Sequence, residues 1–198
     1  MDLQPLYDWI FHQNADGTAL SLKTTGLVLG GLLLAVHLLA LARTEEAIRL
    51  AKTFPRSRAW GIALMVVAGV WGVFVMSHTD MGEFFDWRRR LQITLPVTVL
   101  LMILYVPEFL AVRALGTVLL LAASPVLHAA FLKPQVSRLL LSILAYVWII
   151  AGMYFVGMPY LLRDWIGWLS DKPLRWKLAA LGGAAYGAVM LVAAMLWY

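Results

Sequence analysis

The sequence SHTDMGEFFDWRRR (residues 77–90) leads into LQITLPVTVLLMILYVPEFLAVRALGTVLLLAASPVLHAAFL (residues 91–132), and this stretch decides the fold. Its first part is polar and then acidic, aromatic and basic. Its second part is apolar almost throughout, with the main interruptions at Pro107-Glu108 and Arg113. A hydrocarbon core about 30 Å thick is crossed by a helix of about 20 apolar residues. The stretch therefore predicts two helices that cross a membrane, joined by a turn within residues 107–116.

The composition extends this prediction to the whole chain of 198 residues. It is 62% hydrophobic and 14% charged, whereas soluble domains carry about 25% charged residues. The absence of cysteine excludes disulfides, iron–sulfur clusters and cysteine nucleophiles. The net charge of +5 comes from basic residues near the ends of apolar runs, which suits lipid headgroups better than nucleic acid. We expect a multi-pass integral membrane protein, in a bacterial cytoplasmic membrane, without a nucleic-acid partner.

The polar breaks predict a single transmembrane domain over residues 1–198, an all-α polytopic helix bundle. We expect six spans, or five if one run does not cross. Residues 1–23 mix apolar and polar side chains, which predicts a short interfacial helix. The spans are expected at about residues 24–42, 59–76, 91–106, 117–132, 139–161 and 174–198.

Small residues recur at helical spacing in the first, second and last predicted spans. Glycines on one face of a helix allow another helix to approach closely. We therefore expect each of these faces to pack against a neighbouring span. The glycines concerned are Gly26, Gly30, Gly61, Gly72, Gly183 and Gly187.

The distribution of basic residues predicts the orientation of a six-span protein. With both termini outside, ten Lys and Arg residues fall on the inner side and six on the outer side. Because inner loops are enriched in Lys and Arg, this orientation is favoured. The triplet Arg88, Arg89 and Arg90 lies on the outer side and opposes it. These three arginines could contact lipid phosphates or an acidic partner, although a solvated helix with internal pairing is slightly preferred.

Three histidines are candidates for cofactor binding. His78 and His128 are expected near the outer boundary, and His37 toward the inner side. Two histidines at one depth could ligate a haem, or one could bind a chlorophyll-type magnesium. The alternative, which we favour, is that His78 is an interfacial residue and His128 a packing residue bonded to Ser124. A tetrapyrrole is thus the cofactor candidate, and no separate metal site is predicted.

Glu108, Arg113, Thr98 and Ser124 are candidates for an ion or substrate path. A charge at bilayer depth usually faces protein or water and has a partner. Glu108 would carry a proton or ion, and Arg113 would tune its pKa. The preferred alternative is a charged turn at the membrane surface, with both side chains reaching toward the headgroups.

Polar residues also form a stripe on each helix of the hairpin. If the two helices pack side by side, Thr94 and Thr98 on the third span lie level with Ser124 and His128 on the fourth. The sequence therefore predicts a shared polar seam between these spans.

The sparse polar content of the spans favours a function without catalysis. No catalytic residues are expected, because no nucleophile motif is present. We expect a structural or accessory subunit of a larger membrane assembly, which binds lipid or a hydrophobic cofactor of haem or chlorophyll type through histidine. Its partners would be membrane lipids and other membrane subunits or further copies of the chain. The alternative is a small-solute or ion transporter that uses Glu108, Arg113 and the histidines, and a membrane enzyme ranks third.

Overall fold

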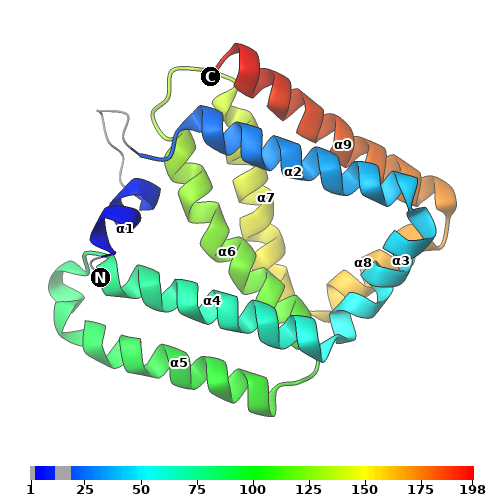
Figure 1. The fold of residues 1–198 in the computed structure, drawn as a ribbon. Helices are drawn as coiled ribbons and strands as arrows, with labels where there is room; N and C mark the ends of the chain where they lie inside the picture. The colour runs from blue at the N-terminus through cyan, green and yellow to red at the C-terminus, as the bar shows by residue number, and fades with distance from the viewer. Residues whose placement is uncertain (1–2, 12–18) are drawn as a thin grey trace.

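A computed structural model describes residues 3–11 and 19–198, and this part of the chain is helical without strands (Figure 1). Five helices are long and apolar enough to cross a membrane, namely α2 (Leu22–Ala42), α4 (Arg58–His78), α6 (Leu110–Ala130), α7 (Arg138–Gly157) and α9 (Pro173–Leu196). The other elements are α1 (Gln4–Phe11), α3 (Thr44–Thr53), α5 (Arg88–Tyr105), α8 (Tyr160–Ser170) and the 3₁₀ turns η1 (Phe54–Arg56) and η2 (Gly82–Trp87). The predicted all-α membrane bundle is confirmed. The predicted N-terminal segment is described only in part, since residues 1–2 and 12–18 lie outside.

Helix α5 corresponds to the third predicted span, and it is not among the five helices that are apolar enough to cross a membrane. Its three N-terminal arginines distinguish it from the five apolar helices, yet it runs antiparallel to α4, with Leu95 against Gly72 and Val99 against Gly69. Its 18 residues span about 27 Å at about 1.5 Å per residue. Helix α6 begins beside the start of α4, where Leu110 contacts Gly61. Helix α5 therefore runs alongside α4, in addition to the five helices that are long and apolar enough to cross a membrane.

The turn between α5 and α6 is shorter than the sequence predicted. Phe109 has a left-handed backbone with φ of 54° and directly precedes α6. A turn this tight lets α6 begin at Leu110, seven residues before the predicted start of the fourth span. Arg113 consequently lies in the helix rather than in a turn. The fifth span is shorter than predicted, because α7 ends at Gly157 and a separate helix, α8, begins at Tyr160.

Helices α2 and α9 form a close antiparallel pair, as Figure 1 shows along its upper edge. A Cβ on Gly30 would lie 3.0 Å from the carbonyl oxygen of Gly187. A Cβ on Gly26 would lie 3.0 Å from the Cβ of Ala194. The predicted small-residue faces of the first and last spans therefore pack against each other.

Two more close approaches hold the centre of the bundle. Gly61 on α4 faces Leu110 and Ala111 on α6, which confirms the predicted face of the second span. Gly116 on α6 meets Gly152 on α7, where a Cβ on either residue would lie 2.8 Å from the carbonyl oxygen of the other. Sequence reasoning did not identify this second contact, although both residues are glycines within apolar runs.

The two ends of the bundle differ in character. Helices α3 and α8 lie together at one end, whereas α1, η2 and the C-terminus lie at the other (Figure 1). The basic connections that contain Arg43–Arg58 and Arg163–Lys177 therefore share one end of the molecule. This arrangement agrees with the predicted grouping of these two connections on one side of the membrane.

The predicted polar seam between the third and fourth spans is wrong. Helix α4 lies between α5 and α6, and α6 packs against α4 and α7 (Figure 1). Thr94 and Thr98 are exposed on α5. Their hydroxyls donate to the carbonyls of Arg90 and Thr94, each at 2.8 Å. Leu95 and Val99 of α5 pack against Gly72 and Gly69 of α4, so the apolar face of α5 is turned toward α4. The hydroxyls of the two threonines are hydrogen-bonded to the backbone of α5 itself.

Candidate functional site

Two of the predicted histidines lie beneath helix α1. The ring of Tyr7 stacks on His78, with centroids 5.7 Å apart and planes at 20°. The ring of Phe11 meets His128 edge-on at 6.2 Å. Tyr7 and Phe11 are themselves 4.9 Å apart. Helix α1 thus connects His78 on α4 with His128 on α6, and we call Tyr7, Phe11, Phe74, His78 and His128 the α1 cluster.

The tautomer of His78 follows from its hydrogen bond. Nδ1 lies 2.8 Å from the carbonyl oxygen of Phe74, one turn back. A carbonyl oxygen only accepts, so Nδ1 carries a proton, and in the neutral ring Nε2 then carries the lone pair. Histidines that bind metals commonly have this arrangement. The rings of Tyr7 and Phe74 also contact the imidazole, so the same geometry serves aromatic packing.

A short hydrogen-bonded chain anchors α1 beside the cluster. The hydroxyl of Thr79 donates to the carbonyl of Val75 at 2.8 Å. The Tyr7 hydroxyl lies 3.0 Å from the hydroxyl oxygen of Thr79. Because Thr79 has already donated its one hydroxyl proton, Tyr7 is the donor in this bond. Arg88 donates to the carbonyl of Thr79 at 2.5 Å. Sequence analysis missed the contribution of Tyr7 and Thr79, which lie far apart in the chain and carry no motif.

Two arginines of the triplet make cation–π contacts with neighbouring aromatic rings. The guanidinium of Arg88 lies 4.9 Å from the centroid of Phe85, and that of Arg90 lies 5.2 Å from Trp87. Arg89 is exposed. Exposed aromatic rings beside arginines are typical of the membrane–water boundary, so this corner suits a position at the headgroups.

His37 does not join the other two histidines. Its Nδ1 donates to the carbonyl of Leu33 at 2.7 Å, and its ring lies directly over Gly183 of α9. A Cβ on residue 183 would overlap the imidazole. His37 therefore fills the contact between α2 and α9.

Glu108 and Arg113 are not joined by an ion pair in the structure. Glu108 is exposed in the turn before α6. Arg113 donates to the carbonyl of Val156 on α7 at 3.2 Å. The other two predicted path residues, Thr98 and Ser124, lie on helices that α4 separates. The predicted path residues are thus distributed over the bundle.

Several hydroxyl groups in the spans are satisfied within their own helices. Each donates to the carbonyl four residues earlier, a bond that a helix offers anywhere along its length. Such side chains do not converge on a common ligand position. They are Ser77, Thr94, Thr98, Thr117 and Ser142.

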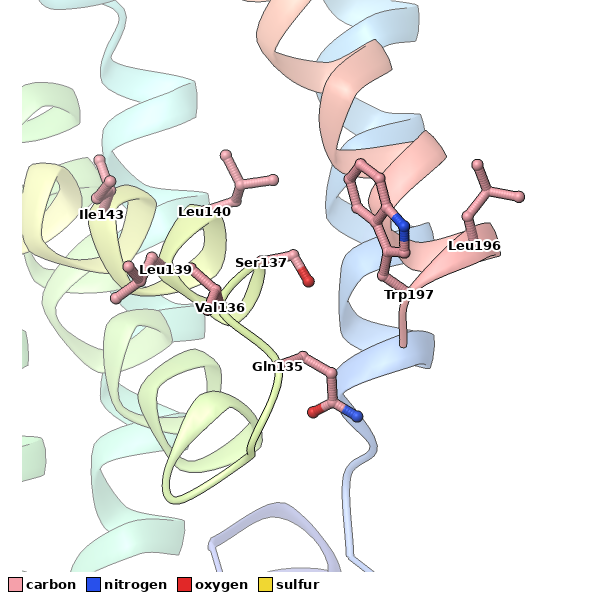
Figure 2. Close-up of a pocket in the computed structure, with 8 residues that line it drawn as sticks. All are labelled: Gln135, Val136, Ser137, Leu139, Leu140, Ile143, Leu196 and Trp197. Carbon is pink, nitrogen blue, oxygen red and sulfur yellow. The ribbon is translucent and has the colours of Figure 1, made fainter.

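An open groove lies where α7 begins and α9 ends (Figure 2). Its volume is about 810 Å³. We call it the α7–α9 groove, and it is lined by Gln135, Val136, Ser137, Leu139, Leu140, Ile143, Leu196 and Trp197. Next to it, the hydroxyl of Tyr198 donates to the carbonyl of Ser137 at 2.6 Å. Burial raises the pKa of Tyr198.

Two smaller apolar grooves lie on either side of α4. One, of about 390 Å³, is formed with α5, and the other, of about 530 Å³, with α1. Val66 and Val70 contribute to both. None of the three histidines lines these grooves or the α7–α9 groove.

Comparisons with protein-family models, curated proteins and solved structures found no match to this chain.

Proposed function

We propose that this chain is a non-catalytic structural or accessory subunit of a larger membrane assembly, located in a bacterial cytoplasmic membrane. The observation that supports this function is the way in which polar groups in the spans are satisfied. Thr94, Thr98 and Thr117 donate to carbonyls of their own helices. Transporters generally bind solutes at mid-depth through unwound helices or converging polar groups, and these threonines provide neither.

The histidines are consistent with this proposal. His37 fills an interhelical contact, and His78 and His128 contact the aromatic rings of α1. Of the three, His78 has the arrangement that best fits a haem or chlorophyll-type ligand, because Nδ1 is anchored and Nε2 holds a lone pair. A bound tetrapyrrole would require α1 to shift, since Tyr7 stacks on the imidazole.

Purification from native membranes tests the accessory role. After mild solubilisation and chemical cross-linking, we expect stoichiometric membrane subunits to accompany the chain, in a particle larger than its monomer. An unrelated membrane protein with the same affinity tag, purified in parallel, controls for non-specific association. A clean monomer without cross-linked partners would contradict the proposal. An absorption spectrum of the same sample tests the tetrapyrrole, because a bound one produces an intense visible band that His78→Ala should remove.

Proteoliposomes separate this function from its transport alternative. A transporter that uses Glu108 and Arg113 would lose flux in Glu108→Gln and Arg113→Gln variants. We expect these variants and the native chain to give the same flux as empty liposomes for protons, alkali cations and small anions. A flux that depends on either residue would support transport instead.

A further inference from the structure

Two residues that line the α7–α9 groove, Gln135 and Ser137, each have a buried side-chain oxygen that the protein leaves unsatisfied. Gln135 lines the groove, and its Oε1 is buried without a hydrogen-bond partner. Buried acceptors of this kind are uncommon and call for a partner such as water, an ion or a ligand. Figure 2 shows the amide of Gln135 at one end of the groove, below Ser137 and Trp197.

The remainder of the groove is apolar and suits a lipid. Leu139, Leu140, Ile143 and Leu196 supply most of its lining, and its volume of about 810 Å³ lies within the usual range of about 300–1,000 Å³ for ligand pockets. The groove is at the end of two spans, and Trp197 is a residue type enriched at the membrane boundary. Its occupant should therefore have an apolar body within the bilayer and a polar head at the surface.

The chemistry of the polar end selects the headgroup. A carbonyl oxygen such as Gln135 Oε1 only accepts hydrogen bonds, so the head must donate one. Segment 131–143 contains Lys133 and Arg138 and no acidic residue, which favours negative charge on the ligand. A choline head cannot donate, and an ethanolamine head adds a positive charge beside these two residues.

We propose that the α7–α9 groove binds one glycerophospholipid with an anionic, hydroxyl-bearing headgroup of the phosphatidylglycerol type. A headgroup hydroxyl donates to Gln135 Oε1. The phosphate lies toward the basic loop, and an acyl chain covers Leu139 and Ile143. This inference does not depend on the histidines or on the accessory role.

Native mass spectrometry of the full chain in mild detergent tests the proposal. Three lipids with equal acyl chains separate the contribution of headgroup charge from that of headgroup hydroxyls. They are phosphatidylglycerol, phosphatidylmethanol and phosphatidylcholine. Phosphatidylmethanol has the same charge as phosphatidylglycerol but no headgroup hydroxyl. We expect phosphatidylglycerol to be retained most strongly. Gln135→Leu should weaken its retention about tenfold, the size of one hydrogen bond to a buried group. Gln4→Leu, the same change at an exposed position of α1, should leave retention unaltered. Ile143→Trp should reduce retention of all three lipids by filling the groove.

Thermal unfolding provides a second measurement that separates lost binding from lost folding. Without lipid, Gln135→Leu should melt at the native temperature or above, because it removes an unsatisfied acceptor. Added phosphatidylglycerol should then raise the melting temperature of the native chain more than that of the variant. Equal retention of phosphatidylglycerol and phosphatidylmethanol would overturn the headgroup assignment. The lipid site would be overturned if native mass spectra showed dimers of the chain without bound lipid. It would also be overturned if Gln135→Leu and Ile143→Trp retained phosphatidylglycerol as strongly as the native chain.

Discussion

The imidazole of His37 occupies the space that a side chain at Gly183 would need. This histidine–glycine contact lies in the interface of α2 and α9, where Gly30 also meets Gly187 and Gly26 meets Ala194. The ring is held in place by its bond to the carbonyl of Leu33 at 2.7 Å. The contact fixes how closely the first and last spans can approach.

Gly183→Ala should therefore destabilise the protein, because the new methyl group would overlap His37. We expect a loss of about 1–3 kcal/mol, the usual cost of overpacking, measured by thermal unfolding in detergent. Gly182→Ala is the matched control, since a Cβ there meets nothing within 4 Å. A second substitution, His37→Ala, should restore part of the stability lost in Gly183→Ala. Equal melting temperatures for Gly183→Ala and Gly182→Ala would contradict the packing role.

Tyr7→Phe should loosen α1 from the bundle. The change removes a hydroxyl that donates to Thr79 at 3.0 Å, a bond worth about 1 kcal/mol. Hydrogen exchange of the α1 amides should become about fivefold faster. Tyr105→Phe serves as control because Tyr105 is 76% exposed. The prediction fails if α1 exchanges at the same rate in both variants.

Gln92→Leu should weaken the attachment of α5 to α4. Gln92 donates to Ser77 Oγ at 3.1 Å across the two helices, and loss of the bond should cost about 0.5–1.5 kcal/mol. Thr98→Val on the same helix should change stability by less than about 0.5 kcal/mol, because Thr98 bonds only within α5. Since the chain has no cysteine, the labelling rate of Val99→Cys reports exposure of the α4–α5 contact. That rate should rise with Gln92→Leu and not with Thr98→Val.

Gly152→Ala should separate α6 from α7. Its Cβ would lie 2.8 Å from the carbonyl oxygen of Gly116, and backbone cannot move aside as a flexible side chain can. We expect a loss of about 1–3 kcal/mol in thermal unfolding. Gly157→Ala, in the same helix with nothing within 4 Å of a Cβ, should be close to neutral. A neutral Gly152→Ala would show that the two helices tolerate greater separation.

The sequence predicted the helices well because apolar length is a strong signal. It also identified Gly30 and Gly187 as packing positions. It did not identify the partner of either glycine, since glycine spacing marks a packed face without naming its neighbour. The spacing of polar residues has the same weakness. Thr98 was predicted to lie in a polar seam with the fourth span, whereas its hydroxyl is hydrogen-bonded to the α5 backbone.

The turn and the candidate sites were harder to predict. Phe109 adopts a left-handed backbone, which is uncommon for a bulky residue and has no signature in composition. Tyr7 and Thr79 form a hydrogen bond although 72 positions separate them in the sequence, so no local pattern could reveal the pair. The α7–α9 groove depends on where α9 ends relative to the α6–α7 loop, so the role of Gln135 becomes visible only in three dimensions.

The pairing of α2 with α9 also sets the order in which the protein can be completed. Ribosomes make α2 before α9, and the intervening helices separate the two in time. At about 5–20 residues per second, the glycine face of α2 waits roughly 10–30 s in the bilayer before its partner emerges. During that interval Gly30 is without its native contacts, Gly187 and Leu191. The interface of α2 and α9 can therefore form only after the helices between them have been made.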